Sequence, residues 1–506
     1  MEVMPPIRLL YAENVVSRRG ARAVQHLEFR MLVENIAYDK LVEVVWSDDD
    51  LTWRTSQAQF HGTAGRGLEI WRVHVRRGLG GPVTLPGDIQ FALHFRVQGS
   101  DYWDNNLGTN HRINESSGVL LCEDLSLLNL GFDGGLRAGR SLHPVEVAVR
   151  RAIAPTRVVV HWSTDRWKTV RTTPCLLRQD RGNRKESQTP KKLEEPDCEI
   201  WQSQVPLGDA FQVEYAISCE TESGVFWDNN FGENYLARHE RLKVLTLNLH
   251  CYQEENQDEK LSRIAKAIDD LGADIVCLQE VGEHWNEGRG SWNSNTAKII
   301  RDRLRRSYDL HTDRSHIGFD RFYEGSAILS RHGFMLQDSG YVSSGTSLHD
   351  INARKIVMGQ VLVPHFGVLN VFSIHLSWWS GGFSEQFSRL HSWATVKHMD
   401  GVAGTLFCGD FNVTQDSEGY RAVVETRDYV DLLTLAEGSD CAGNGWTRRD
   451  RTVASDQGDD RRIDYVFLRS DCRLRVARSG PLFTDRDLYG PVSDHPGYYV
   501  ELEPSW

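Results

Sequence analysis

Hydrophobic and polar residues alternate over short stretches in roughly the first half of the chain. The stretches LVEVVW, IQFALHF, RVVVHW and FQVEYAI place apolar side chains at alternating positions, and clusters of Gly, Pro, Asp and Asn separate them. This alternation is typical of strands with one buried face, and short strands between turn residues are typical of β-sandwiches. We find no persuasive helical period here, so the sequence predicts an all-β fold for this part.

The same part of the chain contains two copies of one pattern. GSDYWDNNLGTNHRI ends the first copy at Ile113, and SGVFWDNNFGENYLA ends the second at Ala237. A matching upstream stretch contains Trp53 in the first copy and Trp167 in the second. The second copy carries an additional polar segment, residues 178–197, which we predict to be a mobile surface loop. The repeat predicts two β-sandwich modules, and we place them at residues 1–117 and 118–240.

From Leu242 onward the pattern changes to an alternation of strands and helices. KVLTLNLH and ADIVCLQEV are typical of strands. Residues 258–271 have apolar positions at helical spacing, with Asp258 as the expected cap, and TAKIIRDRLRRS predicts a second helix. Further strands are predicted at GSAILSR, KIVMGQVLV, GVLNVFSIHL, TLFCGDFN and RIDYVFLR. The alternation predicts an α/β domain over residues 241–506.

Composition and charge limit the classes of function. The chain has 506 residues, of which 40% are hydrophobic and 25% charged, so disorder of the whole chain is excluded. Its net charge of −12 argues against binding to nucleic acid through bulk charge, and nucleic acid is not an expected partner. No apolar run approaches the roughly 20 residues that a membrane helix needs. The first ten residues lack an apolar signal core, and the nine cysteines form no CxxC pair. We therefore expect a cytoplasmic protein that does not bind membranes.

Polar residues follow many of the predicted strands of the α/β domain. Each one alone is typical of a turn, a solvated charge or a buried histidine. Together they form an ordered set of acids, amides and imidazoles at strand ends, which is where sites gather in α/β sheets. The set consists of Asn248, Glu280, His375, Asp410, Asn412, Asp464, Asp494 and His495.

In this order the set resembles the endonuclease/exonuclease/phosphatase superfamily, whose members include DNase I-like nucleases, abasic endonucleases, sphingomyelinases and inositol phosphatases. The resemblance implies a four-layer α/β sandwich that is DNase I-like and hydrolyses phosphate esters with water as the nucleophile. A hard divalent cation suits this chemistry, and we expect Mg²⁺, with Mn²⁺ as an alternative. Glu280 is the first choice for a metal ligand, and Asn248 and Asp494 are expected to complete its shell.

The resemblance also implies roles for the remaining members of the set. Asp410 would orient or deprotonate the attacking water, and Asn412 would hold a phosphoryl oxygen. His495 would face the phosphate, and Asp464 would fix its ring and favour its charged form.

Three further residues extend the expected site. Glu324 and His375 suggest a second histidine–acid pair. Arg354 matches an arginine that contacts phosphate in relatives, although a solvated charge at a strand edge would explain it equally well. His250 stands where some nucleases carry an acid, so we expect it to contact substrate and do not expect a second metal ion there.

Four stretches resemble a bacterial subgroup that includes maltose 6'-phosphate phosphatase. They are TLNLHCYQEENQDEKLSRIA, RSHIGFDRFYEGSAILSR, FSIHLSWWSGGFSEQF and RRIDYVFLR. Within them, Trp378 and Trp379 would offer a flat apolar face to a sugar ring. The alternative is that one tryptophan belongs to the core and the other covers the sheet edge.

The YWDNN-x-G-x-N pattern of both repeats resembles the family 21 starch- and glycogen-binding modules. In that case exposed aromatic rings would stack on glucose and amides would bond its hydroxyls. The alternative is that Asp-Asn-Asn forms a tight turn whose tryptophan is anchored in the core. The expected sugar-binding residues are Trp53, Trp103, Asn105, Asn106, Trp167, Trp227, Asn229 and Asn230.

These resemblances together predict a function. The leading prediction is a Mg²⁺-dependent phosphatase for phosphate monoesters on maltose-type or α-glucan sugars. Its modules would tether it to glycogen, starch or maltooligosaccharide, which raises the local substrate concentration. The alternatives are a nuclease or other phosphodiesterase of the same superfamily, and an inactive glycogen-binding scaffold.

Overall fold

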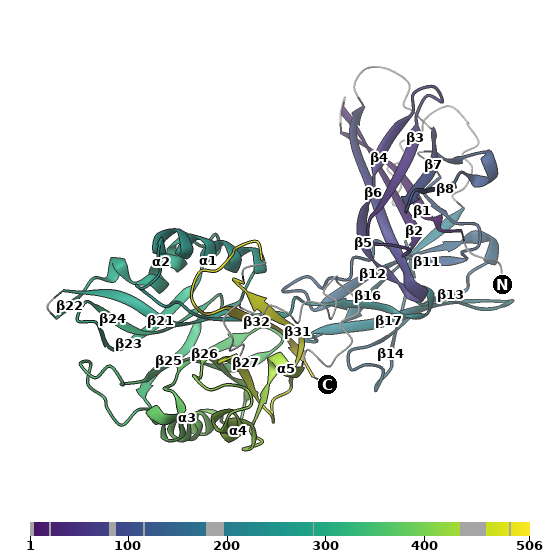
Figure 1. The fold of residues 1–506 in the computed structure, drawn as a ribbon. Helices are drawn as coiled ribbons and strands as arrows, with labels where there is room; N and C mark the ends of the chain where they lie inside the picture. Colours follow the sequence, from purple (N-terminus) through teal and green to yellow (C-terminus); the bar gives the residue numbers. More distant parts are fainter. Residues whose placement is uncertain are drawn as a thin grey trace. The chain divides into compact units, whose positions relative to one another are not determined.

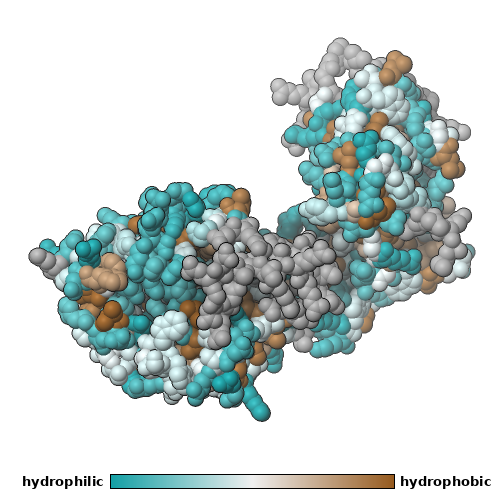
Figure 2. Space-filling view, viewed as in Figure 1, coloured by the Kyte–Doolittle hydropathy of each residue, from teal (hydrophilic) through white to brown (hydrophobic). Residues whose placement is uncertain are grey.

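The computed structural model describes residues 5–19, 22–79, 88–114, 117–178, 197–286, 288–435, 462–484 and 487–505. It divides into two compact units, Met1–Glu240 and Arg241–Trp506, which Figure 1 colours purple to blue and teal to yellow. Strands predominate, and all five α-helices of the described residues belong to the second unit. None of these helices has the length and apolar character needed to cross a membrane. Hydrophilic residues prevail on the face shown in Figure 2, and hydrophobic ones form small separate groups.

The first repeat consists of two antiparallel sheets around one core. The core takes Phe29 from one sheet and Phe91 and Phe95 from the other, all fully buried. One sheet, in order, is β10 (Val119–Leu121), β1 (Ile7–Arg19), β2 (Arg22–Glu34), β6 (Leu68–Leu79) and β5 (Gln59–Ala64). The other contains β4 (Arg54–Gln57), β3 (Lys40–Ser47), β7 (Asp88–Val97), β8 (Ser100–Asp104) and β9 (His111–Asn114). Since β10 pairs with β1, the first sheet reaches past the predicted boundary at residue 117.

The second repeat has the same arrangement. Its core includes Val147 and Val160 from the two sheets and the fully buried ring of Tyr215. One sheet contains β11 (Leu127–Leu130), β12 (Leu142–Arg150), β16 (Cys198–Pro206) and β15 (Leu176–Leu177). The other contains β14 (Arg171–Pro174), β13 (Arg157–Ser163), β17 (Gln212–Thr221), β18 (Gly224–Asp228) and β19 (Tyr235–Arg238). The predicted loop at residues 178–197 lies outside the described residues except for its two ends.

The second unit contains two larger mixed sheets. The first, in order, is β23 (Asp309–Gly318), β24 (Phe322–Ser330), β21 (Ile275–Asn286), β20 (Leu242–Asn248), β32 (Gly497–Pro504) and β31 (Leu474–Leu482), with β22 (Arg289–Gly290) beside β21. The second is β25 (Phe334–Tyr341), β26 (Lys355–Val363), β27 (Gly367–His375), β28 (Val402–Asp410), β30 (Asp464–Arg469) and β29 (Tyr429–Asp431). Strands β20 and β21 of the first sheet contact β27 and β28 of the second.

The helices lie on the outer faces of these sheets (Figure 1). Helices α1 (Gln257–Leu271) and α2 (Thr296–Arg303) bury Ile264, Ile268 and Ile300 in the core of the first sheet. Helix α3 (Phe383–Lys397) and helix α4 (Glu418–Val424) pack on the second sheet, and α5 is the short turn Leu432–Leu435. The predicted cap of the first helix was wrong: Asn256 precedes α1, and Asp258 lies within its first turn, where a negative charge still favours the helix dipole.

Six short 3-10 turns complete the described elements. They span Gly65–Gly67, Asn106–Gly108, Arg151–Ile153, Asn230–Gly232, Trp292–Ser294 and Trp379–Gly381.

Candidate functional site

The register of the strands brings the predicted polar residues to one edge of the second unit. β27 and β28 are parallel and end together, with His375 opposite Asp410. The antiparallel β30 begins at Asp464, which lies opposite Asp410. In the facing sheet β20 ends at Asn248, and His495 lies just before β32, which pairs with β20 in the antiparallel sense. Residues far apart in sequence therefore meet because their strands end or begin at the same edge.

A β-bulge directs Glu280 into this site. The pairing of β21 with β24 shifts register between Leu278 and Val281, and Glu280 has a φ of 49°. Bulges re-aim a side chain next to many active sites, and a non-glycine residue with positive φ requires support from its surroundings. Here Asn248 supplies part of that support, because its Nδ2 donates to Glu280 Oε1 at 2.8 Å.

Gln279, which the sequence analysis did not single out, connects the two sheets behind the site. Its fully buried side chain donates from Nε2 to Ser373 Oγ at 2.9 Å, in the opposite sheet. Its Oε1 accepts from Thr246 Oγ1 at 3.3 Å. Because Gln279 precedes Glu280, this connection fixes both the bulge and the separation of the sheets.

Asp410 occupies the centre of the site. Its Oδ1 accepts the backbone N–H of Asn412 at 2.8 Å, and its Oδ2 accepts Nδ2 of Asn248 at 3.1 Å. The same Oδ2 lies 3.7 Å from His375 Nε2 and 3.9 Å from His495 Nε2. Burial, and then the negative charge of Asp464, raise the pKa of Asp410 to about 8. Its proton affinity is thereby matched to base catalysis near neutral pH.

Asp464 and His495 form the closest acid–imidazole pair of the site. Asp464 Oδ2 lies 2.7 Å from His495 Nδ1, and the Asp464 side chain is 3% exposed. Burial disfavours the charged ring, but the hydrogen bond and charge of Asp464, aided by Asp410 and Asp494, raise the pKa of His495 to about 10. The imidazole is therefore cationic at neutral pH, and its Nε2 faces the carboxylate of Asp410.

The acid–imidazole pair predicted for Glu324 involves a different histidine. The sequence analysis paired Glu324 with His375, but β23 and β24 place His316 directly opposite Glu324, with its Nε2 at 3.5 Å. His375 Nε2 instead lies 3.9 Å from Glu280 Oε1. β23 was not among the predicted strands, so the cross-strand pair with His316 was missed.

Glu280, Glu324 and His375 could hold a cation together, since one ligand atom from each lies within 4.8 Å of the others. Burial, and then the charge of Glu280, raise the pKa of Glu324 to about 8, although Arg354 opposes the change. Burial and the charge of Arg354 hold the pKa of His375 well below its usual range, so its ring is neutral. Two carboxylates that repel each other beside a neutral imidazole fit a divalent cation.

Arg354 lies beside this group. Its Nη1 donates to the carbonyl of Ile351 at 3.0 Å, and its buried Nε has no hydrogen-bond partner among the described residues. Its charge acts on both Glu324 and His375. The guanidinium thus lies close enough to influence two groups of the candidate site.

Asn412 is more constrained than the sequence suggested, and Asp494 contacts residues other than Glu280. Asn412 Nδ2 donates to the carbonyl of Leu376 at 2.8 Å, which leaves one amide hydrogen for a phosphoryl oxygen. The Asp494 side chain is 54% exposed and forms a group with His250 and Glu254, separate from Glu280. His250 Nδ1 lies 2.7 Å from Glu254 Oε1. Asp494 Oδ1 lies 3.6 Å from His250 Nδ1 and 3.9 Å from His495 Nε2, so the predicted metal ligand Asp494 and the predicted substrate contact His250 form a group that adjoins the site at His495.

Trp378 and Trp379 follow β27 at the same edge, and both are exposed, at 58% and 39%. Neither is a core residue, which removes the alternative that one of them belongs to the core. The ring of Trp379 packs 5.9 Å from that of Phe383, which fixes its position.

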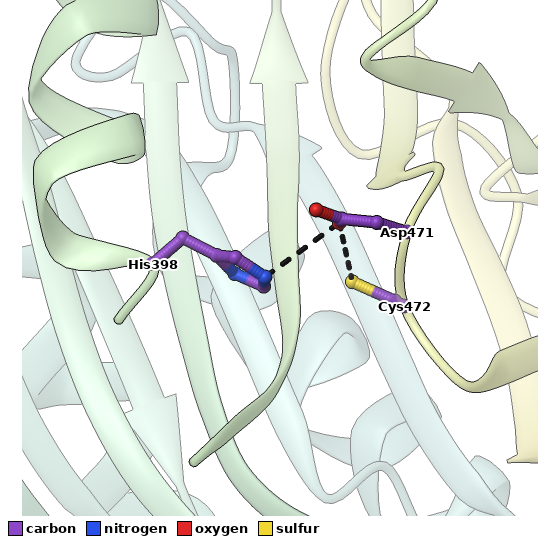
Figure 3. A group of neighbouring side chains, drawn as sticks. All are labelled: His398, Asp471 and Cys472. Atoms are coloured by element: carbon purple, nitrogen blue, oxygen red, sulfur yellow. Dashed lines mark hydrogen bonds and ion pairs between the residues drawn. The ribbon is translucent and has the colours of Figure 1, made fainter. Parts of the chain in front are cut away.

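A further cluster of ionisable side chains lies away from this edge (Figure 3). His398 precedes β28, and Asp471 and Cys472 follow β30, so the cluster lies at the opposite ends of the strands that carry Asp410 and Asp464. Arg469 Nε already donates to both carboxylate oxygens of Asp471, at 3.0 and 3.1 Å. The cluster is separate from the candidate site.

The repeats of the first unit present their motif tryptophans to solvent. Trp103 is 51% exposed and Trp227 54%, so neither anchors its turn in the core. Trp103 stacks on His94 at 4.4 Å, and Trp53 is also exposed. Trp167 is half-buried. Exposed aromatic faces of this kind suit stacking on sugar rings.

The asparagines of the motif hold the turn itself. Asn105 and Asn229 accept the backbone N–H groups of Gly108 and Gly232 through Oδ1, at 3.0 and 3.1 Å. Asn106 and Asn230 donate from Nδ2 to backbone carbonyls four residues on, at 3.1 Å in both copies. Each of the four asparagines therefore makes at least one hydrogen bond within the turn, Asn105 and Asn229 through Oδ1 and Asn106 and Asn230 through Nδ2.

The chain was compared with known proteins. Residues 245–495 match the family described as Endonuclease/Exonuclease/phosphatase family, and residues 146–238 match the Carbohydrate/starch-binding module (family 21). No curated protein matches the chain.

Several solved structures are similar to the chain. An endonuclease/exonuclease/phosphatase family protein from Leptotrichia buccalis is 25% identical, with a TM-score of 0.43, and the match covers 52% of this chain and 99% of that one. A mannosyl-6-phosphatase from Bacteroides thetaiotaomicron is 20% identical, with a TM-score of 0.38 and the same coverage of both chains. TDP2 from D. rerio with a single-strand DNA product is 17% identical, with a TM-score of 0.38, 52% coverage of this chain and 99% of that one.

Members of the matched catalytic family are phosphoesterases and nucleases, and they generally use divalent metal ions. The chain therefore carries a hydrolase domain of the endonuclease/exonuclease/phosphatase family over residues 245–495 and a family 21 carbohydrate/starch-binding module over residues 146–238.

Proposed function

We propose that this chain is a Mg²⁺-dependent phosphatase that hydrolyses phosphate monoesters on maltose-type or α-glucan sugars, and that both N-terminal repeats tether it to a glycogen- or starch-like polymer. We also infer that the second unit is a four-layer α/β sandwich, because helices pack on the outer faces of two sheets that contact each other. The observation that carries the proposal is the meeting of Asp410, the cationic His495 and the Glu280–Glu324 pair at one edge, in a chain that also holds a starch-binding module.

Glu280 and Glu324 are the residues that would hold the cation. Carboxylate oxygens are the ligands that Mg²⁺ prefers, and it commonly takes one or two of them and keeps several waters. Asn248 lies in contact with Glu280 and could add its amide oxygen after a rotation of the side chain. When bound, the cation would withdraw negative charge from the phosphoryl oxygens.

Asp410 would take the proton from the attacking water. Its Oδ2 is directed at the space between His375 and His495, and its Oδ1 is fixed by the backbone of Asn412. A buried carboxylate with a raised pKa accepts a proton more readily than a solvated one. Asn248 holds the carboxylate in this orientation from the opposite sheet.

His495 would donate a hydrogen bond from Nε2 to a phosphoryl oxygen, while Asp464 holds its ring through Nδ1. Arg354 would contribute a second positive charge on the other side of the site, beside Glu324. Charge-assisted hydrogen bonds of this kind suit the charge that develops on the phosphoryl oxygens during transfer.

The surroundings of the site favour a sugar over a nucleic acid. Trp378 and Trp379 offer exposed rings at the edge where the catalytic groups lie, and such rings suit the apolar face of a glucose unit. The chain has a net charge of −12, whereas a nuclease gains affinity from basic residues that neutralise backbone phosphates.

Phosphate release from three substrates, measured side by side with Mg²⁺, tests the proposal. We expect release from maltose 6'-phosphate and from phosphorylated glycogen, and little cleavage of a DNA phosphodiester. Asp410→Asn serves as the inactive control. Cleavage of the DNA diester alone would assign the chain to the nucleases, and inactivity on all three substrates would favour a glycogen-binding scaffold.

A further inference from the structure

The two repeats differ in how far the first two strands of their first sheet pair with each other. In the first repeat β1 and β2 remain paired from Ile7 opposite Val33 to Arg19 opposite Arg22. In the second repeat the equivalent pairing of β11 with β12 ends at Leu130, opposite Glu146. The first residues of β12, Leu142 to Val145, therefore pair only with β16. The chain between the two strands leaves the sheet and forms a loop, residues 131–141.

This loop is held in a defined position. The backbone N–H of Leu136 donates to the carbonyl of Arg238 at 2.9 Å, and the N–H of Arg238 donates to the carbonyl of Gly134 at 3.0 Å. At the other end, the N–H of Leu207 donates to the carbonyl of Ser141 at 2.8 Å. These contacts attach the loop to β19 and to the end of β16.

An open pocket lies between the loop and the first residues of β12, where β12 is not paired with β11. Its lining includes Phe132, the imidazole of His143, and Leu142 and Pro144 from β12; Tyr215 borders it as well, but its ring belongs to the buried core.

Two arginines give the pocket a positive charge. Arg137 and Arg140 line it, and neither guanidinium has an ion pair or a hydrogen bond with any residue that the structure describes. Asp133 also lines the pocket, and its Oδ1 accepts the N–H of Gly135 at 3.1 Å. With His143 neutral, the lining carries a net positive charge in a chain whose net charge is −12.

We propose that this pocket of the second repeat binds a phosphate-bearing glucosyl unit, with Arg137 and Arg140 on the phosphate and the aromatic and apolar wall against the sugar. Guanidinium groups bind phosphate oxygens through paired hydrogen bonds, and aromatic walls suit sugar rings. The inference rests on the proposed function, because the repeat would bind the same phosphorylated polymer that the second unit would hydrolyse. In the first repeat the β1–β2 pairing extends to Arg19 opposite Arg22, so the described residues between these strands form no equivalent loop.

Binding of full-length protein to two forms of one polymer tests the pocket. All proteins carry Asp410→Asn, so that the substrate survives the measurement. Phosphorylated glycogen and the same glycogen after enzymatic dephosphorylation are compared by co-sedimentation. Arg137→Gln combined with Arg140→Gln is the test variant, and Arg76→Gln, an exposed arginine on β6 of the first repeat, is the matched control. Thermal melts verify that each variant is folded.

We expect the preference of the double variant for the phosphorylated over the dephosphorylated polymer to fall about tenfold. This is the size expected when a charge-assisted hydrogen bond is removed. Binding to the dephosphorylated polymer should not change, and the control should keep the full preference. An unchanged preference in the double variant would overturn the proposal. Glucose 6-phosphate should compete better than inorganic phosphate; equal competition would overturn the sugar contact. Hydrolysis of maltose 6'-phosphate by the double variant with Asp410 restored reports on the proposed function separately, because that small substrate needs only the second unit.

Discussion

Replacement of Asp464 by Asn is the change whose effect on activity the structure defines most closely. The substitution keeps an oxygen that can accept the Nδ1–H of His495 but removes the negative charge that sits 2.7 Å from the ring. Burial of His495 already disfavours the cation, and Asp464 is the main group that outweighs it. The pKa of the ring should therefore fall from about 10 to its ordinary value of 6.5 or below.

The magnitude of the loss follows from the fraction of cationic ring. With a pKa of 6.5, about 3% of His495 remains charged at pH 8, whereas about three quarters remains charged at pH 6. In the wild type the ring is charged at both values. With a pKa of 6.5, turnover of Asp464→Asn should thus fall about thirtyfold at pH 8 and only about 1.3-fold at pH 6 from this cause, and a lower pKa increases both losses.

The assay is initial-rate phosphate release from maltose 6'-phosphate between pH 6 and 8, expressed as the ratio of wild type to variant. Asp471→Asn is the matched control, since Asp471 also faces a histidine, with His398 Nε2 at 3.6 Å, but lies at the other end of the same strands (Figure 3). The control should keep the wild-type profile. A ratio for Asp464→Asn that does not change with pH would refute the assignment of a charged His495.

Four other changes have defined outcomes. Gln279→Leu removes the hydrogen bond donated to Ser373 and leaves the buried hydroxyl of Thr246 without its acceptor, so the melting temperature should fall by a few degrees and turnover by about tenfold, with glycogen binding unchanged; full activity would show that the link between the sheets is dispensable. Gly409→Ala should prevent folding of the second unit, measured by circular dichroism, because a Cβ there would lie 2.0 Å from the carbonyl oxygen of Ile374; a soluble, active variant would contradict the packing. Trp103→Ala combined with Trp227→Ala should weaken co-sedimentation with glycogen by about tenfold or more. Unchanged binding would show that glycogen does not bind at these two tryptophans. Chelation of divalent ions should abolish phosphate release, and added Mg²⁺ should restore it. Release that persists after chelation would show that hydrolysis does not require a divalent cation.

Much of the edge of the second unit could be predicted from the sequence, because each polar residue directly follows or precedes an apolar strand. The strands that end at Asn248, His375 and Asp410 are buried and strongly patterned, and parallel neighbours must end at the same edge. The chemistry of the residues then limits what such a cluster can do.

The remaining contacts depend on register, which the local pattern does not contain. His316 meets Glu324 only through the pairing of β23 with β24, and Gln279 becomes a connection only when two sheets face each other. Helix α3 was not among the predicted elements although its buried Phe383, Phe387 and Leu390 recur at helical spacing. The motif asparagines such as Asn105 were expected to bond sugar, and the structure adds a role in the turn, where Asn105 Oδ1 accepts the N–H of Gly108.

The central claim is that Asp410 and the groups around it hydrolyse phosphate esters on a glucan to which the same chain is bound. The most direct measurement is phosphate release from phosphorylated glycogen by the wild type and by Asp410→Asn, with co-sedimentation on that glycogen recorded in parallel. We predict that the substitution reduces release by several orders of magnitude and leaves the bound fraction as it is in the wild type. Equal release by the two proteins would contradict the claim.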